Sequence, residues 1–168
     1  MLVLPIGIRL GTIFDKSQIN EDPDLRWMAS LPAWCTPHKL ITLGMTVRFL
    51  DEAKYGKQYA FSDVPEATKF YHGHSLSVSP KARGRGLGQN LLLRSMRLAQ
   101  DRGCSHVYVM ATSVYSQRIF RSTGFTVLHE TCYKSFKDTR DGKSDFFKDM
   151  EPQHQTAQVV LFDLSTQF

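Results

Sequence analysis

A glycine-rich basic turn between two apolar runs constrains this chain more than any other feature. Residues 83–88 read Arg-Gly-Arg-Gly-Leu-Gly; they follow a strand-like run at 74–78 and precede a helical run at 89–102. Glycine lets the backbone approach a ligand closely, and the first N–H groups of a helix have no intrahelical acceptors. Those donors and the positive end of the helix dipole attract anions. The turn therefore predicts a phosphate cradle, with a flexible basic turn as the alternative.

Hydrophobic periodicity predicts one α/β domain over residues 1–168, built on a mixed sheet. Strands are expected at 2–13, 73–78, 106–111, 125–133 and 156–164, helices at 37–55, 89–102 and 114–123, and a turn at 62–65 with a short helical turn after it. Within 89–102, Leu92, Met96 and Ala99 share one face, which is typical of a helix packed on a sheet.

Composition and charge narrow the classes of partner. The chain is 42% hydrophobic and 22% charged, which suffices for a real core, and no run nears the ~18 apolar residues of a membrane span. The formal charge is +5, but basic residues are dispersed and their densest group, Lys81, Arg83 and Arg85, lies in and beside the glycine turn. A local phosphate-bearing ligand explains this better than nucleic acid, and neither nucleic acid nor membrane is expected as a partner.

Cysteine usage points to a reducing compartment. Cys35, Cys104 and Cys132 are widely spaced and form no C-x-x-C pair. Neither a disulfide framework nor a zinc site is expected, and the cytoplasm is the expected location.

Three motifs together resemble the acetyl-CoA-binding half of the GNAT N-acetyltransferases. They are Arg83-x-x-Gly86-x-Gly88, the preceding Leu-Ser-Val-Ser-Pro at 76–80, and a helix that ends in Gly124-Phe125. The resemblance implies an α/β fold with a mixed, mostly antiparallel sheet flanked by helices and a splayed pair of parallel strands at the acetyl-CoA site. A Rossmann site is disfavoured, because no acidic residue follows a second parallel strand at the expected place.

A narrower resemblance is to the invertebrate arylalkylamine (dopamine-type) N-acetyltransferases. It rests on residues 112–118, 133–137 and 152–154, and the matching region runs from roughly Leu40 onward. Those proteins place an extra strand and helical segments before the position of Ile6, so the domain is expected to be N-terminally short. We find no counterpart of their proposed catalytic glutamate.

The resemblance implies a set of cofactor contacts. Backbone N–H groups of the turn would receive the pyrophosphate, two arginines would add charge-assisted bonds, and strand residues would pair with the pantetheine arm. The residues so assigned are Leu76, Val78, Arg83, Gly84, Arg85, Gly86, Leu87, Gly88 and Gln89. For the arginines, a solvated loop face is the alternative.

The candidate proton donors for the leaving thiolate are hydroxyls. Many family members have a tyrosine where this chain has Phe120, which cannot donate a proton. Two catalytic serines of the dopamine-type enzymes map to Thr112 and Ser116, and Tyr115 is a neighbouring candidate. The alternative is that Thr112 or Ser113 caps the helix.

Two histidines are candidate bases for the amine. His72 and His74 alternate on a strand and should point to one face. Partly exposed strand surface is the alternative for both, and Glu66 or Asp63 is a weaker candidate base. No third ligand at suitable spacing supports a metal site.

Together these features predict acetyl transfer from acetyl-CoA to a small aromatic amine, such as dopamine, serotonin or tryptamine, by direct attack in a monomer. Acetylation of a polyamine or protein amine remains an alternative, and so does a non-catalytic acyl-CoA-binding protein. Trp27, Trp34, Phe61 and Phe70 could line an aromatic pocket or pack in the core.

Overall fold

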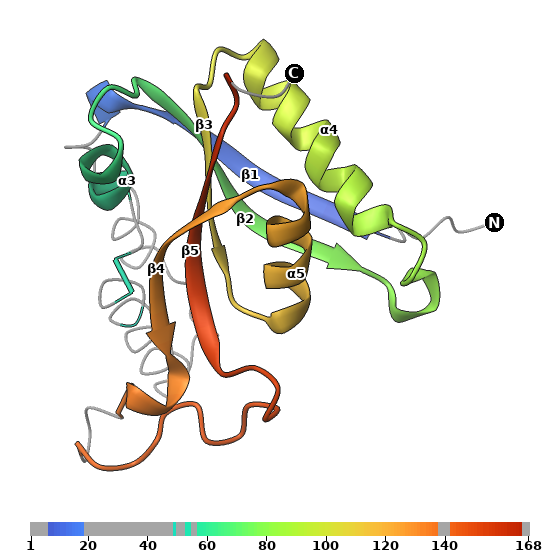
Figure 1. The fold of residues 1–168 in the computed structure, drawn as a ribbon, viewed down its shortest axis with the longest axis vertical. Helices are drawn as coiled ribbons and strands as arrows, with labels where there is room; N and C mark the ends of the chain where they lie inside the picture. The colour runs from blue at the N-terminus through green and yellow to red at the C-terminus, as the bar shows by residue number, and fades with distance from the viewer. Residues whose placement is uncertain (1–6, 19–48, 50–52, 55–56, 138–141, 166–168) are drawn as a thin grey trace, which may run out of the picture.

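One mixed sheet organises the part of the chain that is described. The computed structural model describes residues 7–18, 49, 53–54, 57–137 and 142–165. The strands are β1 (Gly7–Asp15), β2 (Lys69–Val78), β3 (His106–Ala111), β4 (Thr126–Cys132) and β5 (Thr156–Asp163). They lie in the order β1-β2-β3-β5-β4, and of these described pairs only β2–β3 is parallel (Figure 1). The predicted mixed, mostly antiparallel sheet is confirmed.

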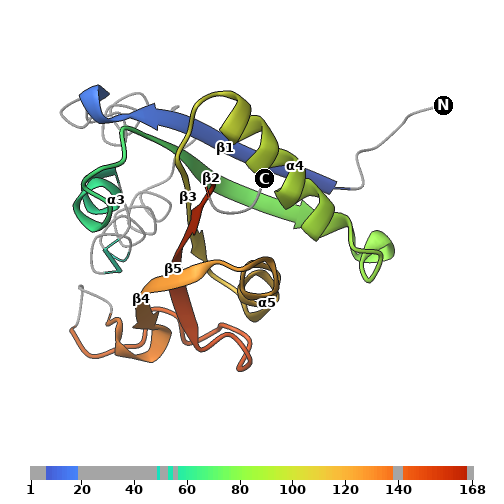
Figure 2. The same cartoon turned by 45° about the horizontal axis from the view of Figure 1, so that its top comes forward.

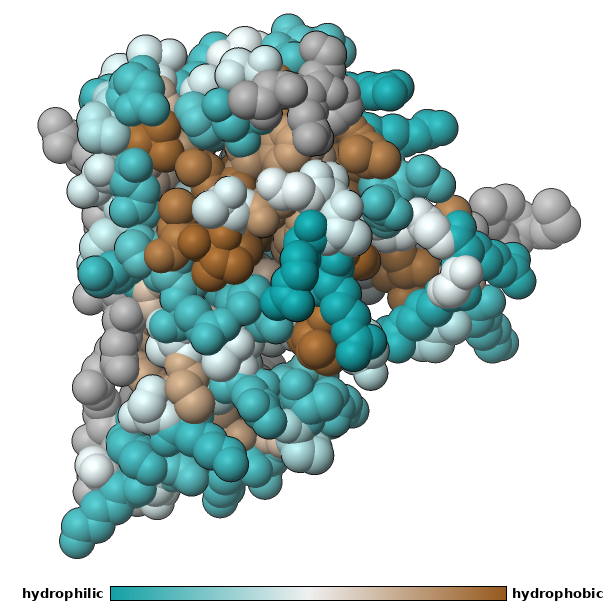
Figure 3. Space-filling model, in the orientation of Figure 1, coloured by the Kyte–Doolittle hydropathy of each residue, from teal (hydrophilic) through white to brown (hydrophobic). Residues whose placement is uncertain are grey.

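Helices α4 (Leu87–Asp101) and α5 (Val114–Thr123) pack on one face of the sheet, as Figures 1 and 2 show. Helix α4 buries Leu92, Met96 and Ala99, the stripe that its spacing predicts, against Val107 and Val109 of β3. The outer surface in the view of Figure 3 is mostly hydrophilic, with hydrophobic patches between the polar side chains. Helix α4 is therefore an ordinary amphipathic element with one buried stripe, and α5 buries Phe120.

The opposite face packs on α3 (Lys57–Asp63). Phe61 of this helix meets Phe14 with ring centroids 5.7 Å apart and Phe70 at 4.9 Å, and all three rings are buried. Phe61 and Phe70 are thus core residues. The prediction of a helical turn after residues 62–65 was wrong, because the helix precedes this turn and is anchored there by Phe61.

The parallel strands β2 and β3 separate halfway along. Their pairing runs only from Phe70↔His106 to Gly73↔Val109, while β2 stays paired with β1 to its end. Gly11 faces Gly73 and Leu10 faces Ser75, so His74 is an extra residue that bends β2. Beyond Gly73 the described strands leave the edge of β2 that faces β3 open, which is the splayed geometry that the resemblance implies.

Strand β2 begins at Lys69, four residues before the predicted start, because Phe70 and Tyr71 are both buried, one on each face. The expected helix at 37–55 lies outside the described residues except for Phe49, Ala53 and Lys54, and Trp27 and Trp34 lie outside them too. None of the described helices is long and apolar enough to cross a membrane.

Candidate functional site

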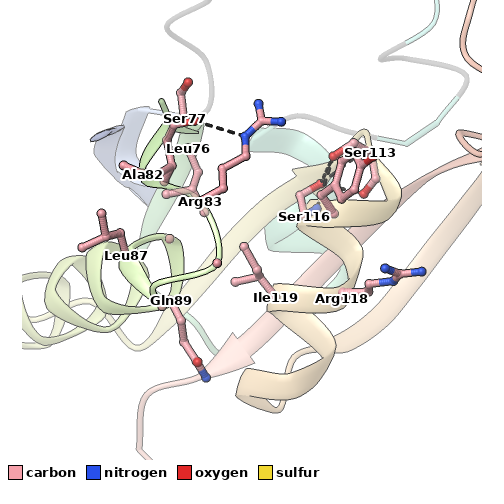
Figure 4. Close-up of a pocket in the computed structure, with 15 residues that line it drawn as sticks. Leu76, Ser77, Ala82, Arg83, Leu87, Gln89, Ser113, Ser116, Arg118 and Ile119 are labelled. Carbon is pink, nitrogen blue, oxygen red and sulfur yellow. Dashed lines mark hydrogen bonds between the residues drawn. The ribbon is translucent and has the colours of Figure 1, made fainter. Parts of the chain in front are cut away.

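A cavity of about 520 Å³ lies where β2 and β3 diverge, between the N-termini of α4 and α5 (Figure 4). Strand β2, the glycine turn and α5 all contribute to its wall. The lining residues are Leu76, Ser77, Val78, Ala82, Arg83, Gly84, Gly86, Leu87, Gly88, Gln89, Ser113, Tyr115, Ser116, Arg118 and Ile119. The cavity therefore brings together eight of the nine residues that the sequence assigns to the cofactor, all but Arg85.

The N-terminus of α4 opens into this cavity without a side-chain cap among the described residues. Gly86 is the N-cap, with a left-handed φ of 70°, and its carbonyl accepts the first helical bond from Asn90. The N–H groups of Leu87, Gly88 and Gln89 therefore have no intrahelical acceptor. A Cβ on Gly88 would lie 3.1 Å from Ile119 Cδ1, so glycine also permits the close approach of α4 to α5.

The wall of the cavity is electropositive. Arg83 on the turn and Arg118 on α5 line it, and no carboxylate does so among the described residues (Figure 4). The Nε of Arg83 donates to the carbonyl of Val78 at 3.4 Å, which ties the turn to the end of β2. Arg85 is exposed in the same turn and does not line the cavity. Two guanidinium groups and a helix N-terminus suit a polyanion.

The N-terminus of α5, in contrast, is capped by the protein. Ser113 Oγ accepts from the Ser116 N–H and Ser116 Oγ accepts from the Ser113 N–H, both at 3.2 Å. Ser116 Oγ also donates to the Ser113 carbonyl at 2.9 Å, and the two hydroxyl oxygens are 3.0 Å apart. The predicted cap is confirmed at Ser113. This capping box engages the hydroxyl hydrogen of Ser116.

Thr112 does not join this arrangement. Its side chain is exposed and does not line the cavity, because the extended backbone of Ser113 (φ −136°, ψ 152°) places Thr112 before the helix rather than one turn below Ser116. Its carbonyl accepts a 2.7 Å bond from the buried phenol of Tyr133, and burial raises the pKa of Tyr133 to about 12. The hydroxyl pair that the structure brings together is Ser113 and Ser116.

His72 and His74 lie outside the cavity lining, on the sheet face that carries α3. Their rings are 4.5 Å apart, so the prediction that both point to one face is confirmed. His72 meets Phe14 edge-on at 5.4 Å, and His74 Nε2 lies 2.7 Å from Thr12 Oγ1. A base in these positions would act from the side of the sheet opposite α4.

A protein-family model matches the segment that forms most of this cavity. The model described as "Acetyltransferase (GNAT) family" matches residues 47–125, which contain β2, the glycine turn, α4, β3 and α5. Residues 47–125 therefore match the GNAT acetyltransferase family, and this segment carries the cavity. GNAT proteins use acyl-CoA, and the cavity lies at the turn that carries the family's motif.

Solved structures show the same fold. Arylalkylamine N-acetyltransferase 2 of Aedes aegypti is 24% identical with a TM-score of 0.72, over 95% of this chain and 68% of that one. Mosquito arylalkylamine N-acetyltransferase like 5b is 23% identical with a TM-score of 0.70, over 94% and 68%. A Drosophila melanogaster polyamine N-acetyltransferase that forms N-acetylagmatine is 19% identical with a TM-score of 0.67, over 94% and 69%. No curated protein matches the sequence significantly.

The cavity in this segment fits a CoA thioester. Uncapped amides and two arginines suit the phosphates, while the open edge of β2 and the apolar side chains of Leu76 and Ile119 suit a pantetheine arm. Sequence reasoning did not assign Arg118 to the site, although it lies one turn after Tyr115 in the 112–118 segment that carries the narrower resemblance. No group of three His, Cys, Asp or Glu placed to hold a metal ion occurs among the described residues.

Proposed function

We propose that this protein transfers the acetyl group of acetyl-CoA to the nitrogen of a small amine, with an arylalkylamine as the first-choice acceptor. The observation that carries the proposal is the uncapped N-terminus of α4 beside the open edge of β2, within the segment that matches the family. The acceptor class is supported by the mosquito neighbours that are arylalkylamine N-acetyltransferases by name. The free thiols Cys104 and Cys132 support a cytoplasmic location.

The chain supplies three kinds of contact to the acyl-CoA. The amides of Leu87, Gly88 and Gln89 receive phosphate oxygens at the N-terminus of α4. Arg83 and Arg118 add charge from opposite walls of the cavity. Backbone groups of β2 at 76–78 pair with the pantetheine amides as a further strand would, in the space from which β3 has diverged.

Acetyl transfer requires a neutral amine, a carbonyl held in place and a proton for the departing thiolate. The nitrogen attacks the thioester carbon, the C–S bond breaks and sulfur takes up a proton. Tyr115 is our first-choice donor, because its side chain lines the cavity and is 54% exposed, and a phenol is more acidic than an aliphatic hydroxyl. Ser116 is the second choice, because the capping box engages its hydroxyl hydrogen.

We place the base that removes the proton of the ammonium group on the face of the sheet opposite α4. His74 and His72 lie there as a contacting pair near the bend in β2. We propose that the amine enters from this face and that the pair accepts its proton through water. The donor and the base would then act from different faces of the sheet.

A polyamine is the second candidate acceptor, because two neighbours are a polyamine N-acetyltransferase and an agmatine N-acetyltransferase by name. Thiol release from acetyl-CoA with tryptamine, dopamine, agmatine and spermidine distinguishes the two classes. Turnover faster with the aromatic amines supports the first choice, and turnover faster with agmatine or spermidine supports the second. Calorimetric CoA binding without turnover of any amine would identify a non-catalytic binding protein.

An introduced negative charge tests the location of the phosphates. Gly84 and Gly142 both have left-handed φ (74° and 65°), and a Cβ on either meets no atom within 4 Å, so Gly84→Glu and Gly142→Glu impose similar strain. Only Gly84 lines the cavity. Gly84→Glu should raise the Kd for CoA at least about tenfold, which is about 1.4 kcal/mol, while Gly142→Glu leaves it unchanged. Equal Kd values for the two variants would refute this location.

A further inference from the structure

A histidine from the segment before β5 holds the first turn of α5. The N–H of Val114, the first residue of α5, donates to Nδ1 of His154 at 3.2 Å, across 40 positions of sequence. The His154 side chain is only 14% exposed. Its ring also meets the ring of Tyr115 edge-on, with centroids 5.5 Å apart. One imidazole therefore contacts both the backbone of the cavity wall and a side chain that lines the cavity.

The hydrogen bond defines the state of the ring. Nδ1 can accept the Val114 N–H only when it carries no hydrogen, so the proton of the neutral ring is on Nε2. That atom lies 3.5 Å from a carboxylate oxygen of Glu151. Among the described residues, Val114, Tyr115 and Glu151 are the partners of the ring, and Glu151 is the only charged one. Protonation would place a second hydrogen on Nδ1, opposite the N–H of Val114.

Other side chains hold the same junction without this dependence on pH near neutrality. The Tyr133 phenol donates to the Thr112 carbonyl at 2.7 Å, and Gln117 Nε2 donates to the Thr156 carbonyl at the start of β5 at 2.7 Å. The serine capping box spans the next turn. His154 is therefore the member of this set of contacts that loses its acceptor when it gains a proton.

We propose that His154 is a positioning residue, which fixes the α5 wall of the cofactor cavity through its neutral Nδ1 and releases it on protonation. The inference rests on the proposed function, because it assigns a regulator to the same cavity. When Nδ1 is protonated, the Val114 N–H loses its acceptor, and the first turn that carries Tyr115 and Ser116 opens more often. The affinity for CoA should then fall in acid by more than the protonation of the CoA phosphates alone would cause.

The variant His154→Asn tests the role of the hydrogen-bond acceptor separately from that of the imidazole ring. The asparagine Oδ1 occupies nearly the place of Nδ1 and accepts a hydrogen bond at every pH, whereas His154→Ala removes the acceptor. The measurements are calorimetric CoA affinity at pH 7.5 and 5.5 and amide hydrogen exchange of residues 112–117 without ligand. Wild type should lose roughly twofold to tenfold more affinity in acid than His154→Asn, the range for one net hydrogen bond. His154→Ala should show the weak, rapidly exchanging state at both pH values.

The role of His154 and the proposed function can fail independently in these experiments. If wild type and His154→Asn lose affinity in parallel, or if the Val114 amide of wild type has the same protection factor (the intrinsic exchange rate at that pH divided by the observed rate) at both pH values, the inference is overturned while CoA binding stands. Failure of wild type to bind CoA at pH 7.5 overturns the proposed function, and the exchange measurement then still tests the contact itself. A Val114 protection factor that falls in acid in wild type but not in His154→Asn supports the inference.

Discussion

The buried phenol of Tyr133 should make the protein lose stability in alkali. Tyr133 is 4% exposed and donates to the Thr112 carbonyl, and burial raises its pKa to about 12, against about 10 in an unfolded chain. The folded state therefore binds this proton more tightly than the unfolded state does. By linkage, the contribution of this proton to the free energy of unfolding is complete below pH 10 and declines as the pH rises toward 12. At pH 11 the loss is about 1.4 kcal/mol.

Urea unfolding of wild type and Tyr133→Phe between pH 8 and pH 11 isolates this contribution. At pH 8 the variant should be less stable by about 1 kcal/mol, the net value of the lost hydrogen bond. At pH 11 that difference should vanish or reverse, because only wild type has a tyrosine here that ionises in the unfolded chain while it stays protonated in the folded state. Phe120→Leu, another change in the core, should show the same difference at both pH values. A Tyr133→Phe difference that does not change with pH would refute the reasoning.

Two further predictions concern the first turn of α5. Ser113→Ala should lower the free energy of unfolding by about 0.5–2 kcal/mol, measured by urea unfolding, since it removes the cap; Ser122→Ala, near the other end of α5, is the control and should cost less. Tyr115→Phe should lower kcat about 100-fold with little change in KM for acetyl-CoA, while Ser116→Ala affects mainly stability. Thiol-release kinetics that show the larger kcat loss in Ser116→Ala would identify the serine as the proton donor instead.

Helix α5 was predicted from sequence because all its signals are local. Ser113 caps the helix at its start, and Gly124 ends it in the left-handed conformation with φ 96°. The glycine turn was equally readable, because Gly86 has a positive φ and a Cβ on Gly88 would crowd the Ile119 side chain. Such positions admit few residue types, so the sequence records them.

The contacts that a local pattern could not predict are long-range. Nothing near His154 indicates that its acceptor faces Val114, 40 positions earlier, and nothing near Tyr133 indicates the Thr112 carbonyl, 21 positions earlier. The resemblance assigned Thr112 and Ser116 together, but Ser113 is extended and separates them. Helix α3 was missed because its anchor, Phe61, packs on Phe14 of β1 and Phe70 of β2, and no pattern within α3 itself indicates these contacts.

The two helix N-termini at the cavity explain why the sequence indicates the cofactor more clearly than the chemistry. At α5 the protein satisfies the first N–H groups itself, with Ser113, Ser116 and His154, so these polar side chains already have structural partners. At α4 the N-cap is a glycine with no side chain to offer, and the amides of the first turn face the cavity. A helix end left uncapped beside a cavity requires an external acceptor, and a phosphate group is the acceptor that its dipole and the neighbouring arginines favour. The polar residues at the start of α5 serve the fold whether or not they also serve the reaction, so residue type alone does not separate the two roles. The variants Tyr115→Phe and Ser116→Ala separate them, because the Tyr115 phenol lines the cavity while the Ser116 hydroxyl closes a capping box.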